Sequence, residues 1–124
     1  MTRTVLLMIL ASVVMSALAQ IAMKSGMSDR TVVDSLAGGV GWPAAARIAA
    51  TPLVWLGLGI YAASAVVWLL VLARVEVSLA YPFVGLGFVL TMFLGWLVHD
   101  DALTVSRVAG TLLVVAGVVV LAKG

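Results

Sequence analysis

Hydrophobic residues form four long runs along this 124-residue chain, and no run has a charged side chain near its middle. Each run has about the 20 residues that a helix needs to cross the hydrocarbon layer of a bilayer. Backbone groups in lipid must be hydrogen-bonded within the chain, so long runs rich in Leu, Val and Ala favour helices over barrel strands. The pattern predicts an all-α integral membrane protein with one domain, residues 1–124, and transmembrane helices at about residues 4–24, 52–73, 77–98 and 102–122.

In the only long connection, residues 25–51, Gly38, Gly39, Gly41 and Pro43 interrupt regular structure. It is nevertheless too apolar for a solvated linker. Trp42 lies within it, and tryptophan is typical of the interface between membrane and water. We therefore expect an interfacial loop with short helical turns.

The first residues also resemble a secretory signal peptide, because Arg3 precedes an apolar stretch and Ala17 and Ala19 imitate a cleavage site. A removed leader is therefore an alternative interpretation. The apolar run continues past this point to Lys24, which favours a first transmembrane helix.

A polar stripe follows the first helix, with Ser12, Ser16, Gln20 and Lys24 spaced four residues apart. This spacing places the four side chains on one helix face. They could hydrogen-bond to a neighbouring helix, or they could line a polar path for a substrate. Lys24 ends the stripe, where its ammonium group can reach the head groups and contact a phosphate.

The second helix places Tyr61 and Trp68 on one face, which is consistent either with packing or with ligand contact. Arg74 and Glu76 follow in a tight turn, so the second and third helices should be antiparallel neighbours. Tyr81 begins the third helix beside a proline.

Small residues mark the third and fourth helices. In the third, Pro82, Gly85 and Gly87 permit either a bend or close packing. In the fourth, Gly110 and Gly117 are seven residues apart and predict a tight contact with another helix, here a dimer contact.

Composition narrows the functional classes. Hydrophobic residues make up 65% of the chain and charged residues 10%, which excludes a soluble globular protein. A net charge of +2 does not indicate nucleic-acid binding. With no cysteine and one histidine, the sequence predicts no metal site and no cofactor. The sequence also shows no group of side chains that could act together in catalysis, which favours a non-enzymatic role.

Positive charges are nearly balanced between the two predicted membrane faces. One face has Arg3, Arg74 and Lys123, and the other has Lys24, Arg30, Arg47 and Arg107. This distribution gives little bias in orientation. Two chains could therefore pair in parallel or antiparallel.

The whole chain resembles a four-helix member of the drug/metabolite transporter superfamily, which contains the small multidrug resistance exporters. Residues 101–110 (DALTVSRVAG) and 115–119 (VAGVV) resemble its last loop and helix. The resemblance implies a small multidrug resistance-like bundle in which Gly110 and Gly117 contact a partner. Those exporters pair antiparallel and carry a glutamate eight residues before the lysine that ends the first helix. This chain has Ser16 there, and a serine cannot bind a proton and a cation in turn.

A second resemblance, to the aminoarabinose-phosphoundecaprenol flippase subunits, covers the first helix and nearly all of the chain from the second helix onward. It rests on the spacing of Ser16, Gln20 and Lys24, on residues 67–72 (VWLLVL) and on residues 80–82 (AYP), with Phe88 and Val89 downstream. This chain departs from those subunits at two places. It has Gly85 and Gly87 where they tend to have polar residues, and it has Glu76 where they commonly have proline.

We therefore expect a flippase subunit of the bacterial inner membrane that moves a polyprenyl-phosphate-linked sugar or a related amphipathic lipid. Its partners would be the membrane lipid and a second four-helix subunit, in a homodimer or a heterodimer. The alternatives are a proton-coupled exporter of small cations and a non-transporting scaffold of a membrane glycosyltransferase. The residues expected to contact the substrate are Ser16, Gln20, Lys24, Tyr61, Trp68, Arg74, Glu76 and Tyr81.

Overall fold

The computed structural model describes residues 2–123, and every regular element in that range is a helix. The elements are α1 (Arg3–Met27), α2 (Arg30–Ala37), α3 (Trp42–Ala49), α4 (Pro52–Leu72), α5 (Val77–Ala80), the 3-10 helix η1 (Tyr81–Phe83), α6 (Val84–His99) and α7 (Val105–Lys123). Four stretches are long and apolar enough to cross a membrane, namely α1, α4, α7 and the continuous segment Val77–His99. The predicted all-α membrane fold is confirmed.

Side-chain caps mark where α1 and α7 begin. Thr2 precedes α1 and accepts a hydrogen bond from the Val5 amide (3.2 Å). The last helix begins at Val105 instead of residue 102, because the Thr104 hydroxyl accepts a hydrogen bond from the Arg107 amide (3.1 Å). An oxygen of this kind at a helix start satisfies a backbone donor that the helix itself leaves unpaired.

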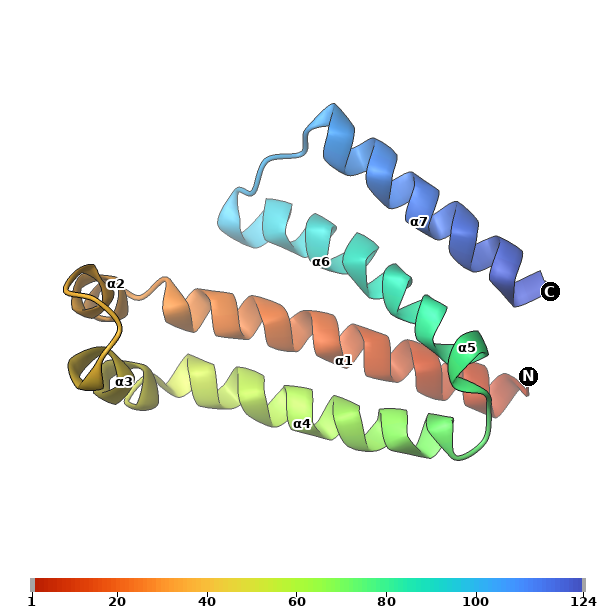
Figure 1. The fold of residues 1–124 in the computed structure, drawn as a ribbon, viewed down its shortest axis with the longest axis horizontal. Coiled ribbons are helices and arrows are strands. Elements are labelled where there is room, and N and C mark those ends of the chain that lie inside the picture. Colours follow the sequence, from red (N-terminus) through yellow and green to blue (C-terminus); the bar gives the residue numbers. More distant parts are fainter. Residues whose placement is uncertain (1, 124) are drawn as a thin grey trace.

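The helices α1 and α4 lie side by side and antiparallel along most of their length (Figure 1). Glycines allow this close approach. A Cβ atom at Gly57 would lie 2.9 Å from the Ala19 carbonyl oxygen, and one at Gly26 would lie 2.9 Å from the Val54 amide nitrogen. Small residues at such positions let helix backbones approach in a membrane, where burial of apolar area supplies little attraction.

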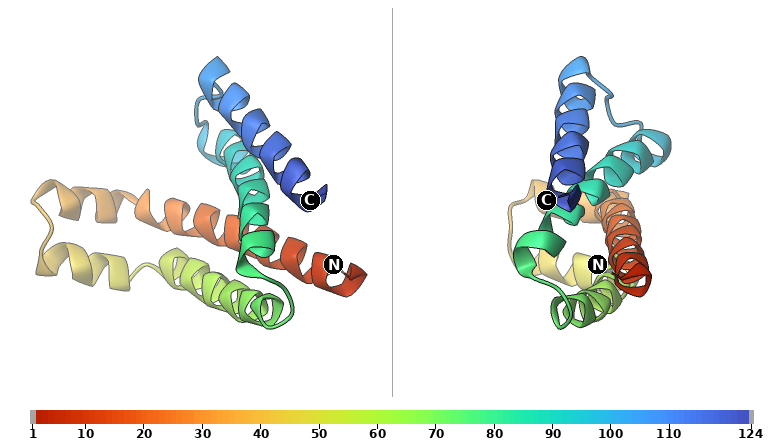
Figure 2. Two further views of the ribbon diagram at one scale, coloured as in Figure 1. Left: turned by 45° about the vertical axis from the view of Figure 1, so that its right-hand side comes forward. Right: turned by 90° about the vertical axis from the view of Figure 1, so that its right-hand side faces the viewer.

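The other two spans are arranged as successive layers on this pair. The helix α6 crosses α1 at an angle, and α7 packs on the far side of α6 (Figure 2). Gly87 faces the Val13 side chain of α1, and Gly85 faces Val114 and Val118 of α7. The outermost helix, α7, buries little of its surface within the chain.

The third span changes helix type near its start. Residues Tyr81–Phe83 form a 3-10 turn between α5 and α6. Pro82 has no backbone N–H and cannot continue the α-helical hydrogen-bond pattern. The glycines that follow, Gly85 and Gly87, contact α7 and α1. Both options left open by the sequence are therefore present, the irregularity at the proline and the packing at the glycines.

The connection between α1 and α4 contains two amphipathic helices, each eight residues long. They lie beyond the ends of α1 and α4, and in Figure 1 they are seen nearly end-on while the long helices run across the page. Trp42 is 82% exposed at the start of α3. The side chain of Asp29 caps α2, and its hydrogen bonds from Thr31 lower the pKa of the carboxyl group.

Gly57 and Gly59 provide a matched test of the packing between α1 and α4. We expect Gly57→Ala to lower the free energy of unfolding by about 1–3 kcal/mol, because the added methyl group would overlap with α1. A methyl group added at Gly59 would have no neighbouring atom within 4 Å. Gly59→Ala should therefore be neutral or stabilising, as alanine favours helix more than glycine does. Denaturant titration in detergent micelles measures the free energy of unfolding of both variants. Equal losses of this free energy would contradict the packing of α1 against α4.

Candidate functional site

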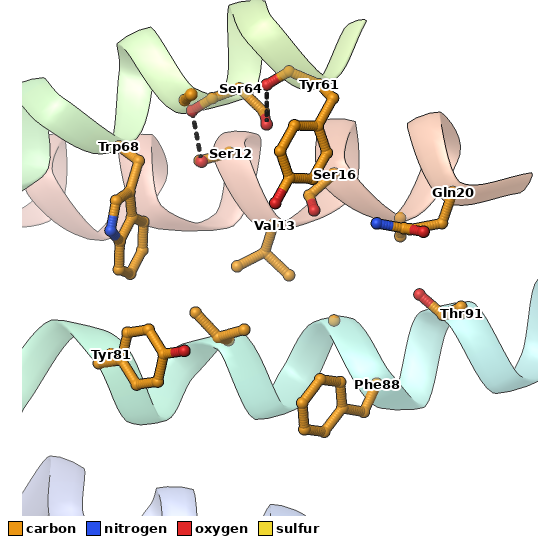
Figure 3. Close-up of a pocket in the computed structure, with 14 residues that line it drawn as sticks. Ser12, Val13, Ser16, Gln20, Tyr61, Ser64, Trp68, Tyr81, Phe88 and Thr91 are labelled. Atoms are coloured by element: carbon orange, nitrogen blue, oxygen red, sulfur yellow. Dashed lines mark hydrogen bonds between the residues drawn. The ribbon is translucent and has the colours of Figure 1, made fainter. Parts of the chain in front are cut away.

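A groove of about 550 Å³ lies between α1, α4 and the third span (Figure 3). Its lining comes from three segments far apart in sequence. They contribute Ser12, Val13, Ser16, Ala17 and Gln20 from α1, Tyr61, Ser64, Ala65 and Trp68 from α4, and Tyr81, Val84, Gly87, Phe88 and Thr91 from the third span.

The polar stripe on α1 has two different roles. Ser12 is buried, and its hydroxyl donates to the Ser64 carbonyl oxygen of α4 (2.9 Å). The Ser64 hydroxyl in turn donates to the Tyr61 carbonyl oxygen (2.7 Å). Figure 3 shows these two hydrogen bonds at the roof of the groove. Ser12 and Ser64 therefore join α1 to α4, which is one of the two interpretations that the sequence allowed for the stripe.

One and two turns further along α1, Ser16 and Gln20 lie on the groove itself. Ser16 is half-buried and Gln20 is exposed. Among the residues that line the groove, the hydrogen bonds drawn are the two made by Ser12 and Ser64 (Figure 3). The Ser16 hydroxyl and the Gln20 amide are thus available to a ligand.

The groove has an aromatic end and a polar end. Trp68 and Tyr81 lie at one end, while Gln20 and Thr91 lie at the other, with Tyr61 between them (Figure 3). The side chains of Tyr61 and Tyr81 are 45% and 62% exposed. Aromatic residues from two helices therefore border an opening toward the surroundings of the protein, which in a membrane is lipid.

Five of the eight predicted contact residues line this groove, namely Ser16, Gln20, Tyr61, Trp68 and Tyr81. Lys24 lies one helical turn beyond Gln20 and is exposed. Arg74 and Glu76 lie in the turn between α4 and α5, outside the lining.

The cations Lys24 and Arg74 flank opposite ends of the groove. Arg74 reaches toward α1 at Met8, with 3.9 Å between its Nη1 atom and the Met8 sulfur. Since a helix rises about 1.5 Å per residue, Met8 and Lys24 are roughly 24 Å apart along α1. One phosphate group cannot contact both side chains at the same time.

Thr91 is a groove residue that was not predicted from the sequence. A signal was present, because it is the only hydroxyl-bearing residue between Pro82 and Val98. Its spacing from Val84, Gly87 and Phe88 places all four on one helix face. Near the polar end, the Ser25 hydroxyl and His99 Nε2 are hydrogen-bonded at 3.1 Å. This hydrogen bond joins the end of α1 to the end of α6.

The lining residues are uncharged, and the charged side chains lie toward the two ends of the bundle. Within residues 2–123, no group of three His, Cys, Asp or Glu side chains could hold a metal ion. The groove can therefore offer hydroxyl, amide, indole and aromatic groups to a ligand in a partly apolar setting.

Sequence comparison relates nearly the whole chain to known proteins. It is 37% identical over 116 residues to a Pseudomonas aeruginosa (strain UCBPP-PA14) protein named "Probable 4-amino-4-deoxy-L-arabinose-phosphoundecaprenol flippase subunit ArnE", covering 94% of this chain and 95% of that protein. A protein of the same name from Pseudomonas savastanoi pv. phaseolicola is 30% identical over 116 residues, with 90% and 91% covered. One from Salmonella paratyphi B is 32% identical over 71 residues, with 56% and 64% covered. No family model and no solved structure matches the chain.

Substitutions at Ser12 and Ser16 distinguish the structural part of the polar stripe on α1 from the part that faces the groove. Ser12→Ala should reduce the free energy of unfolding by about 0.6–1.7 kcal/mol, the range for hydrogen bonds between membrane helices. Ser16→Ala removes a hydroxyl that bonds to no other lining residue, so its effect should stay within about 0.5 kcal/mol. Both are measured by unfolding in detergent micelles. A larger loss for Ser16→Ala than for Ser12→Ala would contradict the assignment.

Proposed function

We propose that this chain moves the head group of a polyprenyl-phosphate-linked sugar across the membrane. The chain belongs to the ArnE family of 4-amino-4-deoxy-L-arabinose-phosphoundecaprenol flippase subunits. The chain is a transporter subunit and a multi-pass protein of the bacterial inner membrane. A carrier of such a lipid needs a polar path for the head group and an opening through which the isoprenoid tail can stay in the bilayer.

The observation that carries this proposal is the groove, which combines uncharged polar groups with an aromatic-lined opening. Ser16, Gln20 and Thr91 supply hydrogen-bonding groups, while Tyr61 and Tyr81 border the exposed side. A hydrated head group loses water when it enters the membrane, and hydrogen bonds from the lining offset that cost. The tail needs no dedicated site, because lipid itself solvates it.

Phosphate contact is assigned to the ends of the groove. Lys24 follows Gln20 by one turn, and Arg74 lies at the opposite end. An ammonium or guanidinium group near the interface can form charge-assisted hydrogen bonds with phosphate. We assign Lys24 and Arg74 to successive contacts on the two sides of the membrane, with Glu76 beside Arg74 in the same turn.

A proton-coupled cation exporter would require an acidic side chain inside the membrane. Glu76 is the acid nearest the aromatic end in sequence, yet it lies in a turn outside the groove lining. From that position its carboxylate cannot contact a cation held in the groove. The site therefore favours a lipid carrier over this alternative.

A second chain is part of the proposal, because three segments leave the groove open on one side. The face of α7 that contains Gly110 and Gly117 is exposed, and a Cβ atom at either position would have no neighbour within 4 Å. Such glycines let a helix from a partner approach closely. We assign them to the dimer contact, with a copy of this chain or a similar subunit as the partner.

Transport can be tested with the purified chain in liposomes that contain a polyprenyl phosphate linked to a radiolabelled sugar. Membrane-impermeant periodate oxidises only sugars in the outer leaflet, so it reports movement between leaflets. We expect wild-type protein to accelerate movement and Gln20→Leu to slow it about tenfold, the effect of losing one or two hydrogen bonds. Thr4→Leu, an exposed position at the start of the same helix, is the matched control.

No movement with the wild-type chain, alone or with a co-purified subunit, would favour the scaffold alternative. Proton release on binding lipophilic cations would favour the exporter alternative. Either result would refute the flippase proposal for this chain.

Dimerisation is tested separately on α7. Gly110→Leu and Gly117→Leu should each shift the protein from dimer toward monomer, because a bulky side chain separates the two backbones. Val119→Leu adds bulk at an exposed position on the opposite side of the helix and should leave the dimer intact. Mass measurement in detergent distinguishes these outcomes. Unchanged dimers in both glycine variants would show that this face contacts lipid.

A further inference from the structure

We propose that α3 lies in the lipid interface of the membrane with one apolar face directed into the bilayer, while α2 beside it keeps its exposed face in water. The partner of the α3 face is the bilayer that surrounds the four spans. The inference goes beyond the proposed function, because it concerns the connection between α1 and α4 and does not depend on the substrate. It also separates the expected interfacial loop into a helix that contacts lipid and a helix that contacts water.

The exposed face of α3 is apolar along its whole length. Trp42 is 82% exposed, and alanines follow it at spacings of three and four residues, which keep side chains on one side of a helix. The face consists of Trp42, Ala45, Ala46 and Ala49. Val40, just before the helix, is 96% exposed. Helices in a membrane interface direct a face of this kind about 5–10 Å into the boundary between head groups and acyl chains.

The charged residue of α3 points away from this face. Arg47 follows Trp42 by five residues, which places its side chain on a different side of the helix. Hydrogen bonds from Thr31 are the main cause of the lowered pKa of the Asp29 carboxyl group, and the positive charge of Arg47 lowers it as well. The guanidinium group of Arg47 therefore lies toward the start of α2. Its charge does not have to enter lipid when the apolar face does.

A hydrogen bond sets the depth of α3 relative to the spans. Trp55 lies in the first turn of α4 and is 60% exposed, and its indole N–H donates to the Ala49 carbonyl oxygen at the end of α3 (2.6 Å). The end of α3 is thus level with the start of a transmembrane helix. Tryptophan is enriched at this level of membrane proteins, because its ring is apolar and its N–H needs a polar partner. Trp42 and Trp55 both lie at this end of the bundle.

The exposed face of α2 is charged instead. Arg30 and Asp34 are one helical turn apart and exposed, whereas Val32 on the opposite side is fully buried. The helices α2 and α3 pack against each other, and Figure 1 shows that both lie across the direction of the spans. Because a charged side chain is costly to remove from water, the exposed face of α2 stays in water.

The helix α3 needs little affinity of its own for the membrane. Eight residues with mostly small side chains bind a bilayer weakly as a free peptide, but α3 is connected on both sides to transmembrane helices. This connection makes its contact with lipid an intramolecular step. Gln20 lies seven residues before the end of α1 at Met27, a rise of about 10 Å. The anchored α3 therefore holds the polar end of the groove at a constant depth below the head groups.

Nitroxide labels on single cysteines test the two faces. The chain has no cysteine, so Ala45→Cys and Asp34→Cys each give one labelled site in the full chain, which is reconstituted into phosphatidylcholine liposomes. Oxygen concentrates in lipid, whereas a nickel chelate supplied on both sides of the membrane stays in water. We expect the label at Ala45→Cys to be more accessible to oxygen. The label at Asp34→Cys, the matched control on α2, should be more accessible to the chelate.

Three results would overturn the inference. Equal access of the chelate to both labels would show that water covers α3. A label at Ala45→Cys that neither reagent reaches would show that protein covers it, such as a second copy of the chain. Lipid contact that appears only when an anionic phospholipid is added would show attraction by charge, whereas the uncharged face of α3 predicts no such dependence. All three would leave the flippase proposal standing, because transport is not measured.

Trp55→Phe provides a second, independent readout. It removes the donor to the Ala49 carbonyl oxygen and keeps an aromatic ring, so the label at Ala45→Cys should become more accessible to the chelate. Trp96→Phe is the matched control, because Trp96 is another exposed tryptophan, on α6, and its replacement should leave the label unchanged. An equal response of the label to both substitutions would contradict the role of the Trp55 hydrogen bond in setting the depth of α3.

Discussion

The close contact between α1 and α4 determines where the polar side chains of this protein point. Gly57 and Gly26 allow the two backbones to approach, and the hydrogen bond from Ser12 to Ser64 fixes one helix against the other. Once one face of α1 is committed to α4, the adjacent face with Ser16 and Gln20 must turn toward the third span. The groove is therefore a consequence of helix packing.

Much of this arrangement could be predicted from the sequence because the membrane restricts the options. Long apolar runs must be helical, so the four spans follow from hydropathy. The spacing of Ser16 and Gln20, and of Tyr61 and Trp68, shows which residues share a face. The sequence did not show which faces meet. Thr91 was missed for that reason, since a single hydroxyl in an apolar helix becomes informative only when its neighbours across the groove are known.

One other feature required three-dimensional information. Gly85 and Gly87 are close together in sequence, yet they contact different helices, α7 and α1. Positions two residues apart point in different directions on a helix, so spacing alone could not assign both contacts.

The first and last helical residues, Arg3 and Lys123, lie at the same end of the bundle (Figure 1). This follows from an even number of spans, and it constrains how such a protein can evolve. A tandem gene duplication that joined two copies head to tail would give two halves with the same orientation in the membrane. To become a single chain with inverted halves, a duplicated gene would have to gain or lose one span at the junction. Two separate polypeptides avoid that step, because each can insert in its own direction.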